Sequence, residues 1–313
     1  MTIKFYKEPR LENPDLICGW PGIGRIGIMA VEYMRRALAA EEFGEIEPWD
    51  FFEPRKLTIQ DGLLKDLEFP ANKFYYKEFE NRDLLIFIGE EQPAGDARMY
   101  AAGEKAYAMA NLVLDIAEQF GCRRVYTSGA AVTQTHHSLK SRVWAVPNSE
   151  DLIDEVRGYD NTILMSEVEG RHGQGAITGM NGLLLGVARK RGIKALCLMG
   201  EIPYYLQASP WPYPRGSVSV LEVLAAALGI DVDLVPLIEM SKKIDGSIEM
   251  FLRSLYEAEA IPPPIRNEIR ESIEKMKSIR QSTGPITDED QKRIMEHIDE
   301  FFKKGSKGDE RAS

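Results

Sequence analysis

The sequence predicts an α/β protein: a mainly parallel or mixed sheet flanked by helices, followed by a helical C-terminal extension. Two observations lead to this prediction. Short apolar runs alternate with helical patterns as far as residue 228, and helical patterns alone follow Pro236. Such alternation is typical of a sheet covered by helices. The 313 residues are 44% apolar and 28% charged, the composition of a globular chain with a sizeable core.

Five short apolar runs predict the strands. Each ends at a glycine or a polar turn, which is typical of strands buried on both faces. The runs are 16–18, 84–88, 125–127, 162–165 and 195–199. Cys18, Cys122 and Cys197 lie in or beside such runs and far apart in sequence. We therefore expect buried thiols, with neither a disulfide framework nor a thiolate metal site.

Helical patterns lie between the runs. From Ala106 to Phe120, apolar residues recur at spacings of three and four, which predicts a helix with one buried face that ends at Gly121. Three further helices are expected at 27–40, 178–191 and 218–228. Gly192 and Gly229 follow the last two and provide their stops.

The chain changes character after residue 235. Helices are expected near 236–259, 265–281 and 288–304, and Pro262 to Pro264 separate the first two because consecutive prolines cannot continue a helix. We expect a core domain over 1–235, a helical extension over 236–304 and a disordered tail over 305–313. Apolar helix faces in the extension would be easiest to bury in a symmetric assembly, which predicts a homo-oligomer.

Charge and hydropathy limit the partners. The formal net charge of −10 opposes nucleic-acid binding, which needs clustered Lys and Arg. No run of 18 apolar residues predicts a membrane span, and the first ten residues lack the apolar stretch of a secretion signal. We expect a cytoplasmic protein that binds neither membrane nor nucleic acid.

Ligands of open α/β sheets usually bind beyond the carboxyl ends of the strands, so the loops there are the candidate sites. After the first run, Gly22, Gly24 and Gly27 match G-x-G-x-x-G. A dinucleotide site also needs a second strand that ends in an acid about 20 residues on, and 43–50 shows no apolar strand. A tight turn that lets the helix pack closely is therefore favoured over nucleotide binding.

Two further loops carry acids and histidines. Glu90 and Glu91 could act as acid and base, but neighbours in extended chain point apart. We expect one of them to cap a helix near 95 or 96 instead. His136 and His137 end the loop 128–137. Neighbouring histidines lack the spacing of metal ligands on one helix face, so we expect no metal and a loop histidine bonded to backbone.

The most credible ligand loop is 170–179. Arg171 and His172 precede a helix start there, which suits an anion. Its glycines equally suit a tight connection, and both interpretations stay open. The sequence contains neither a G-x-S-x-G elbow nor a P-loop, so no catalytic residue and no cofactor are predicted.

An aromatic loop follows the last run. Tyr204, Tyr205, Trp211 and Tyr213 stand among four prolines between 203 and 214. Aromatic side chains held rigidly are typical of protein interfaces, and they also suit a loop folded onto its own core.

Three blocks carry a family resemblance. They are Gly19-Trp20-Pro21-Gly22-Ile23-Gly24 through Ala30, Gly170 through Gly186, and Gly200-Glu201-Ile202-Pro203-Tyr204-Tyr205 through Leu228. Over about 10–235, the chain resembles the proteasome assembly chaperone family, the group related to the second such chaperone, in its prokaryotic form. The resemblance implies a three-layer α/β/α core of the phosphorylase/hydrolase-like kind, self-association, no established catalytic residues and a role in assembling proteasomes or other ring complexes.

Two functions are therefore weighed. The first is a non-enzymatic scaffold or assembly chaperone that binds itself and proteasome subunits or another protein complex. Its interface candidates are Tyr204, Tyr205, Trp211 and Tyr213. The alternative is a protein that binds a small molecule or a nucleotide, a hydrolase among the options, at the carboxyl ends of the strands. Its candidates are Gly22, Gly24, Glu90, Arg171, His172 and Glu201.

Overall fold

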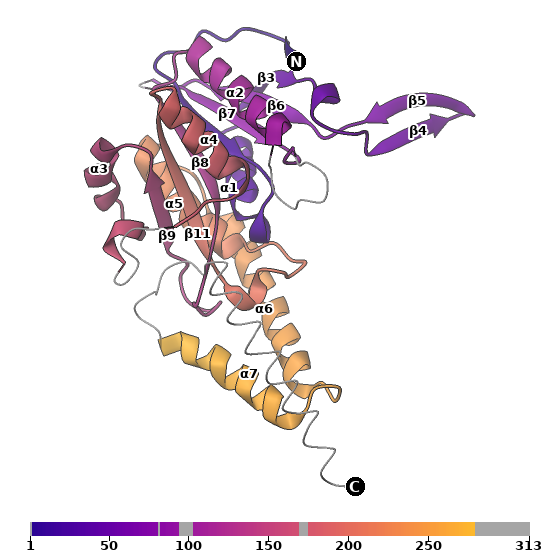
Figure 1. The fold of residues 1–313 in the computed structure, drawn as a ribbon, viewed down its shortest axis with the longest axis vertical. Helices are drawn as coiled ribbons and strands as arrows, with labels where there is room; N and C mark the ends of the chain where they lie inside the picture. The colour runs from indigo at the N-terminus through magenta and orange to yellow at the C-terminus, as the bar shows by residue number, and fades with distance from the viewer. Residues whose placement is uncertain (1, 81, 94–102, 169–174, 279–313) are drawn as a thin grey trace.

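The computed structural model describes residues 2–80, 82–93, 103–168 and 175–278. Within these ranges nine strands form one mixed sheet in the order β1-β3-β6-β7-β2-β8-β11-β9-β10, and β4 pairs with β5 in a separate two-stranded sheet. Helices flank the large sheet, and further helices follow at the C-terminal side (Figure 1). The predicted fold class is confirmed.

The elements have these bounds. The strands are β1 (Ile3–Phe5), β2 (Asp15–Gly19), β3 (Glu41–Ile46), β4 (Lys56–Gln60), β5 (Leu63–Glu68), β6 (Asn72–Lys77), β7 (Leu84–Gly89), β8 (Arg124–Thr133), β9 (Val143–Pro147), β10 (Thr162–Leu164) and β11 (Lys194–Pro203). The α-helices are α1 (Ile26–Ala37), α2 (Gly103–Gln119), α3 (Ile153–Arg157), α4 (Gly179–Lys190), α5 (Pro214–Leu228), α6 (Val235–Glu257) and α7 (Pro263–Lys275).

Four parallel strands, β7, β2, β8 and β11, form the centre of the sheet. Their side chains enter two cores on opposite faces: Ile17 belongs to one core, whereas Leu16 and Cys18 belong to the other. Alternate residues of a strand face opposite sides, so a strand covered on both faces is a continuous apolar run. This is why these four strands could be located from the sequence.

Helices cover both faces of the sheet. Helices α2 and α4 contact each other on one face and contribute Met109 and Leu184 to its core. Helices α1 and α5 contact each other on the other face and contribute Val31 and Leu221. The α/β/α layers implied by the family resemblance are therefore present.

Strands β8 and β11 are longer than the apolar runs suggested, and they pair in parallel from Lys194–Arg124 to Pro203–Thr133. Ser128, expected to open a loop, lies inside β8, and Glu201, expected after the last strand, lies inside β11. Small and polar residues interrupt the apolar pattern there without interrupting the backbone ladder.

Six strands were not predicted: β1, β3, β4, β5, β6 and β9. The expectation that no strand occupies 43–50 was wrong, because β3 covers Glu41–Ile46. In β3 only Phe43, Gly44 and Ile46 are buried. Outer antiparallel strands of this kind keep charged residues on a solvated face, and their mean hydropathy is therefore low.

Strands β4 and β5 form a hairpin that projects from the body, and we call residues 56–68 the arm (Figure 1). Asp61 and Gly62 both have positive φ, 53° and 76°, as the two central residues of a type I′ turn require. An Asp-Gly pair between two apolar-containing runs is a strong hairpin signal, and it was the one by which the arm could have been predicted.

Helices α6 and α7 lie in the expected extension, whereas the helix expected at 288–304 and the tail expected at 305–313 fall outside the described residues. Pro263 and Pro264 occupy the first turn of α7, where no backbone N–H is needed. Leu237, Ile248 and Ile273 join the core beneath α1 and α5. The apolar faces expected to require an assembly are thus buried in part by this chain itself.

Candidate functional site

The glycine loop after β2 packs against the chain itself. Gly24 has φ 58°, a conformation that favours glycine, and its carbonyl accepts the N–H of Tyr213 at 2.7 Å. A methyl group on Gly24 would lie 2.7 Å from Ile202 Cδ1, whereas Gly22 has no atom within 4 Å of that position. Close packing between this loop, β11 and the aromatic loop therefore accounts for Gly24.

The G-x-G-x-x-G match does not lie in a dinucleotide-binding βαβ unit. Helix α1 leads to β3, which is three places from β2 in the sheet and antiparallel to its neighbours β1 and β6. In a dinucleotide fold, the helix leads to a parallel strand of the same unit. The position of β3 weighs against nucleotide binding, for a different reason from the one the sequence suggested.

Glu90 and Glu91 hold the base of the arm. Glu90 Oε2 lies 2.8 Å from Arg55 Nη1, and Glu91 Oε1 lies 2.5 Å from Arg55 Nε. Glu90 also accepts the N–H of Ala71 at 3.1 Å. The two carboxylates, expected to point apart, converge on one guanidinium next to β4. The helix start near 95 or 96 lies outside the described residues.

Glu201, whose carboxylate is buried, forms an ion pair with the partly exposed Arg142. Its side chain is 1% exposed, and Arg142 Nη2 donates to its Oε1 at 2.9 Å. The Trp144 indole N–H donates to the same oxygen at 3.0 Å, and the Arg142 N–H donates to Oε2 at 3.1 Å. These contacts tie β11 to the start of β9. Glu201 and Glu90 therefore bind different arginines, and β2 and β8 separate their strands.

His136 and His137 are both buried, with ring centroids 4.1 Å apart. His137 Nδ1 lies 2.8 Å from the Tyr205 hydroxyl, and its Nε2 lies 2.8 Å from Glu249 Oε1 on α6. His136 Nδ1 accepts the N–H of Ser138 at 3.1 Å. Burial and the neighbouring His137 lower the pKa of His136 to about 4. The pair joins the loop after β8 to the aromatic loop and to α6.

Arg171 and His172, the charged residues of the favoured ligand loop, lie outside the described residues. Nearby, Gln92 spans the start of that loop's helix. Its Oε1 accepts the N–H of Met180 at 3.0 Å, and its Nε2 donates to the Pro21 carbonyl at 2.5 Å. These two bonds join the loop after β7 to the loop after β2 and to the start of α4.

The aromatic loop divides into buried and exposed residues. Tyr213 is 2% exposed, so its selection as an interface residue was wrong: the residue is buried inside the chain, with its Cβ beside Gly24. Tyr205 is partly buried, and its hydroxyl accepts the N–H of His137 at 3.0 Å. Tyr204 and Trp211 are also partly buried and keep part of their surface in solvent.

Trp211 extends its surface onto α6. Its ring lies 5.5 Å from that of Phe251 at an interplanar angle of 70°. Phe251 is 41% exposed, and its neighbour Met250 is 68% exposed. We call Trp211, Met250 and Phe251 the aromatic patch. Sequence reasoning missed Met250 and Phe251 because it treated the loop and the extension as separate features.

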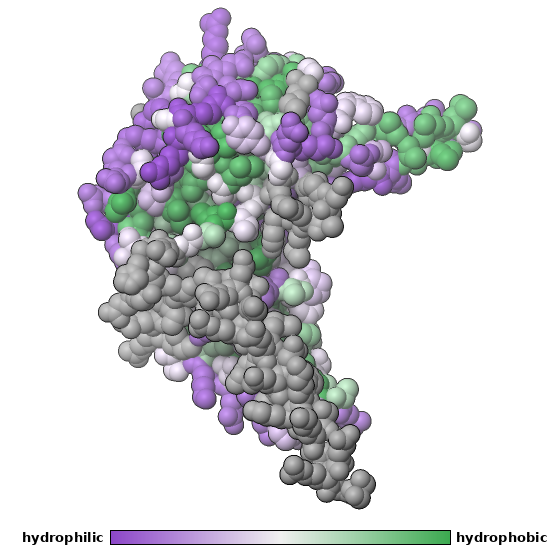
Figure 2. Space-filling view, viewed as in Figure 1, coloured by the Kyte–Doolittle hydropathy of each residue, from purple (hydrophilic) through white to green (hydrophobic). Residues whose placement is uncertain are grey.

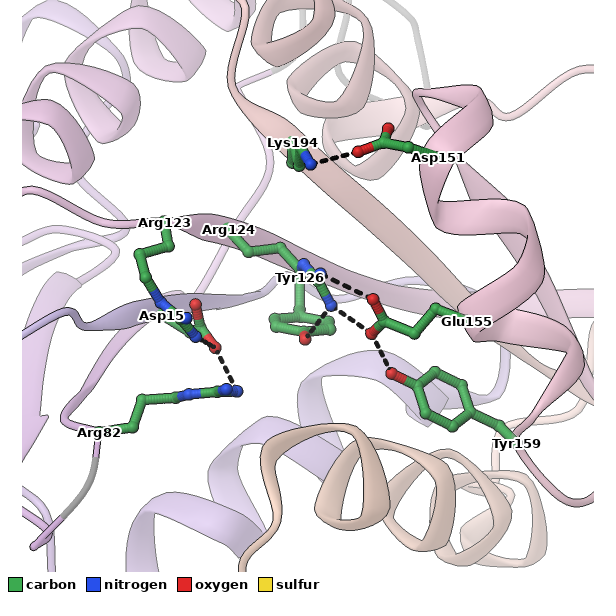
Figure 3. A network of polar contacts seen from close by, with 9 residues as sticks. All are labelled: Asp15, Arg82, Arg123, Arg124, Tyr126, Asp151, Glu155, Tyr159 and Lys194. Carbon is green, nitrogen blue, oxygen red and sulfur yellow. Dashed lines mark hydrogen bonds and ion pairs between the residues drawn. The ribbon is translucent and has the colours of Figure 1, made fainter.

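A second polar cluster occupies the amino ends of the central strands (Figure 3). Arg124 Nη2 donates to Glu155 Oε2 at 2.8 Å, and its Nη1 donates to the Tyr126 hydroxyl at 3.0 Å. The side chain of Asp15 is 1% exposed and lies 3.0 Å from Arg82 Nη1. Burial raises the pKa of Asp15 in spite of its arginine neighbours. These pairs fasten β2, β8 and α3, and they face away from the predicted site.

The described residues form neither a metal site nor a membrane span. Among the described side chains, no cluster of His, Cys, Asp and Glu has the size to hold a metal ion. In the same part of the chain, no helix combines the length and the hydropathy of a membrane span. Cys18 and Cys197 are buried free thiols as expected, and Cys122 is partly exposed.

Comparisons with known proteins agree on one family. A model of the PAC2 family matches residues 16–251. Among curated proteins, the uncharacterized protein MJ1210 of Methanocaldococcus jannaschii is 28% identical over 267 residues, which are 84% of this chain and 93% of that protein. The uncharacterized protein MJ0106 of the same organism is 21% identical over 250 residues, 79% of this chain and 90% of the relative.

Solved structures share the fold. PbaB of Pyrococcus furiosus, described as an archaeal proteasome activator, is 29% identical, with a TM-score of 0.66 over 80% of this chain and 98% of that one. PbaA of the same organism, described as an archaeal homolog of proteasome-assembly chaperone, is 22% identical, with a TM-score of 0.57 over 90% of this chain and all of that one.

Proposed function

Because this chain belongs to the PAC2 family, we propose that it is a non-enzymatic chaperone that binds other proteins and assists the assembly of a larger complex. We propose proteasome subunits as the first client to test. Two solved structures with the same fold support this choice: PbaB is described as a proteasome activator, and PbaA is described as a homolog of proteasome-assembly chaperone. Self-association belongs to the same proposal.

The aromatic patch is the observation that carries this proposal. Trp211 and Phe251 pack edge to face on the outer surface, and Met250 extends the apolar area beside them. Trp is enriched among the few residues that dominate binding energy at interfaces, and Met adapts to varied partners. The loop prolines and the body of α6 hold these side chains in place, so binding costs little conformational entropy.

The polar residues at the strand ends also favour a non-enzymatic function. Glu90, Glu91 and Glu201 form ion pairs with arginines of the chain, and His137 is bonded on both ring nitrogens. A catalytic acid or base needs a free position toward its substrate. These contacts support a structural role for the four residues. Of the residues proposed for the small-molecule alternative, Arg171 and His172 lie outside the described residues.

A pull-down from the native host at low salt, read by quantitative mass spectrometry, tests the proposal. We expect the full chain to recover proteasome subunits in stoichiometric amount. The double variant Trp211→Ala/Phe251→Ala should recover at least about tenfold less, because it removes two aromatic anchors. Circular dichroism establishes that the variant is folded.

Met240→Ala is the matched control. Met240 lies on the same helix, is 45% exposed and belongs to no part of the aromatic patch. It should leave recovery unchanged. If the double variant recovers as many proteasome subunits as the wild type, the aromatic patch is not the binding surface. If the wild-type protein recovers only copies of itself, proteasome subunits are not its client.

A further inference from the structure

We infer that the arm packs its apolar face against the same face of the arm of a second copy of this chain. The inference names a surface for the self-association proposed above, and it does not depend on client binding. It rests on the strand register of the arm, on its exposure and on the distribution of charge.

The register divides the arm into two unlike faces. Residues directly opposite each other in an antiparallel pair share a face. The pairs on the apolar face are Leu57–Leu67 and Ile59–Leu64. The pairs on the polar face are Lys56–Glu68, Thr58–Asp66 and Gln60–Leu63, so Leu63 is the one aliphatic residue on that face. The polar face is satisfied within the arm: Lys56 Nζ lies 3.7 Å from Glu68 Oε1, and Thr58 donates to the same carboxylate oxygen at 3.1 Å.

The apolar face has no cover within the described chain. Leu57, Ile59 and Leu64 are 59%, 69% and 62% exposed. Strands β4 and β5 contact each other far more than any other described element, and Figure 2 shows hydrophobic residues gathered on the projecting arm. An isolated two-stranded hairpin is only marginally stable in water and needs a covered apolar face. The arm therefore requires a partner surface.

Side-chain contacts hold the base of the arm, so the arm projects in a fixed direction. Arg55 precedes β4 and is held by Glu90 and Glu91. Phe69 follows the arm directly and packs on Trp49, with ring centroids 4.5 Å apart. These contacts set the direction in which the apolar face points, so it can meet an identical face in a defined geometry.

Charge selects a second copy as the occupant. The chain carries a net charge of −10, so two copies repel each other at long range. The apolar face of the arm has no charged side chain, and the charges elsewhere on the arm nearly balance. They are Lys56, Lys65, Asp61, Asp66 and Glu68. Two arms can meet without burying like or unpaired charges, and two-fold symmetry covers both apolar faces in one contact.

Sedimentation of the full chain tests the inference. We expect the wild-type protein to self-associate at micromolar concentration. Ile59→Ser/Leu64→Ser should weaken self-association about 100-fold or more, because each substitution removes a large aliphatic side chain from the contact. Since these side chains are largely exposed in the described part of the chain, the variant should keep the circular dichroism of the wild type. Trp211→Ala/Phe251→Ala should keep the wild-type mass.

Crosslinking locates the contact independently. A thiol crosslinker of short reach should join chains of Ile59→Cys, on the apolar face, and should not join chains of Thr58→Cys, on the polar face. A monomeric wild-type protein, an arm variant with wild-type mass, or equal crosslinking of both cysteine variants would overturn the inference. The inference would also be overturned if the arm variant kept the wild-type mass in sedimentation but no longer recovered the client. In that case the arm would be a client-binding surface.

Discussion

At the scale of the residue, Gly27 explains how α1 can lie directly on the sheet. A β-carbon on Gly27 would be 2.1 Å from the Ser128 carbonyl oxygen of β8. Backbone cannot move aside as a side-chain tip can, so the absence of a side chain sets the distance between helix and sheet. The same residue was the last glycine of the dinucleotide pattern, and packing accounts for it fully.

Gly27→Ala should therefore destabilise the protein by about 3 kcal/mol, since overpacking against backbone forces the helix outward. Chemical denaturation measures the effect. Gly186→Ala is the control: Gly186 lies inside α4, with nothing within 4 Å of the position of a β-carbon. That substitution should stabilise by about 0.5–1 kcal/mol through helix propensity. If both substitutions had the same effect on stability, α1 would not be packed tightly against the sheet at Gly27.

His136 makes stability depend on pH. Its pKa falls from about 6.5 in an unfolded chain to about 4 in the fold, because it is buried beside His137. A lowered pKa means that the folded protein resists protonation. The stabilising contribution is complete above pH 6.5, declines as the pH falls, and is lost at about 4.

Denaturation at pH 7 and at pH 4.5 measures this contribution. The wild-type protein should lose about 2 kcal/mol from this site, with solvent screening reducing the full effect of the shift. His136→Asn keeps an acceptor for the Ser138 N–H and removes the titrating ring, so its loss should be smaller by that amount. An identical pH dependence in the variant would show that other groups control acid unfolding.

Glu201 belongs to the same scale. Glu201→Gln keeps the shape of the buried side chain but leaves the partly exposed Arg142 without its charged partner. We expect a loss of about 3 kcal/mol in the free energy of unfolding. Thermal or chemical denaturation measures it. A neutral effect, combined with loss of binding to a small molecule, would return Glu201 to the role of a ligand residue.

At the scale of the element, α6 is held to the body at a polar contact in its middle. His137 bonds Glu249 there, while Ile248 and Leu252 enter the core on either side. The other ring nitrogen of His137 forms a hydrogen bond with the Tyr205 hydroxyl. One imidazole therefore links α6 to the aromatic loop. The aromatic patch depends on this link for its alignment.

Glu249→Ala should loosen α6 without unfolding the protein. Loss of one hydrogen bond, worth about 1 kcal/mol, should raise amide hydrogen exchange in the second half of α6 about fivefold. Glu239→Ala, an exposed position on the same helix, should leave exchange unchanged. Equal protection in both variants would show that the apolar contacts alone seat the helix.

The elements also show what the sequence could reveal. Strands β2, β7, β8 and β11 are covered on both faces, so their apolar runs are continuous and predictable. Strands β3 and β6 carry charge on an exposed face, and aliphatic and polar residues alternate along the first strand of the arm. None of these strands therefore forms a continuous apolar run. Tyr213 was misjudged because burial depends on the helix and the loop that meet it, which lie far away in the sequence.

At the scale of the whole molecule, acidity and the arm act against each other. The net charge of −10 makes copies repel each other, whereas the proposed contact between arms would hold them together. Added salt screens the repulsion within a Debye length of about 10 Å at 0.1 M and strengthens apolar burial at most slightly. Self-association through the arm should therefore tighten severalfold between 0.05 and 0.5 M sodium chloride. Sedimentation measures this, and weakening with salt would indicate an ionic contact instead.

The arm also differs from the body in how far apart its contacts lie in the sequence. Its two strands are joined by Asp61 and Gly62, whereas β8 must find β11 across some 60 residues. A hairpin closes in about 1–10 μs, but at 5–20 residues per second the ribosome needs on the order of ten seconds to make the chain from the arm to β11. During synthesis the arm is thus complete while the body is not, and nascent copies on neighbouring ribosomes already display the face through which they would pair.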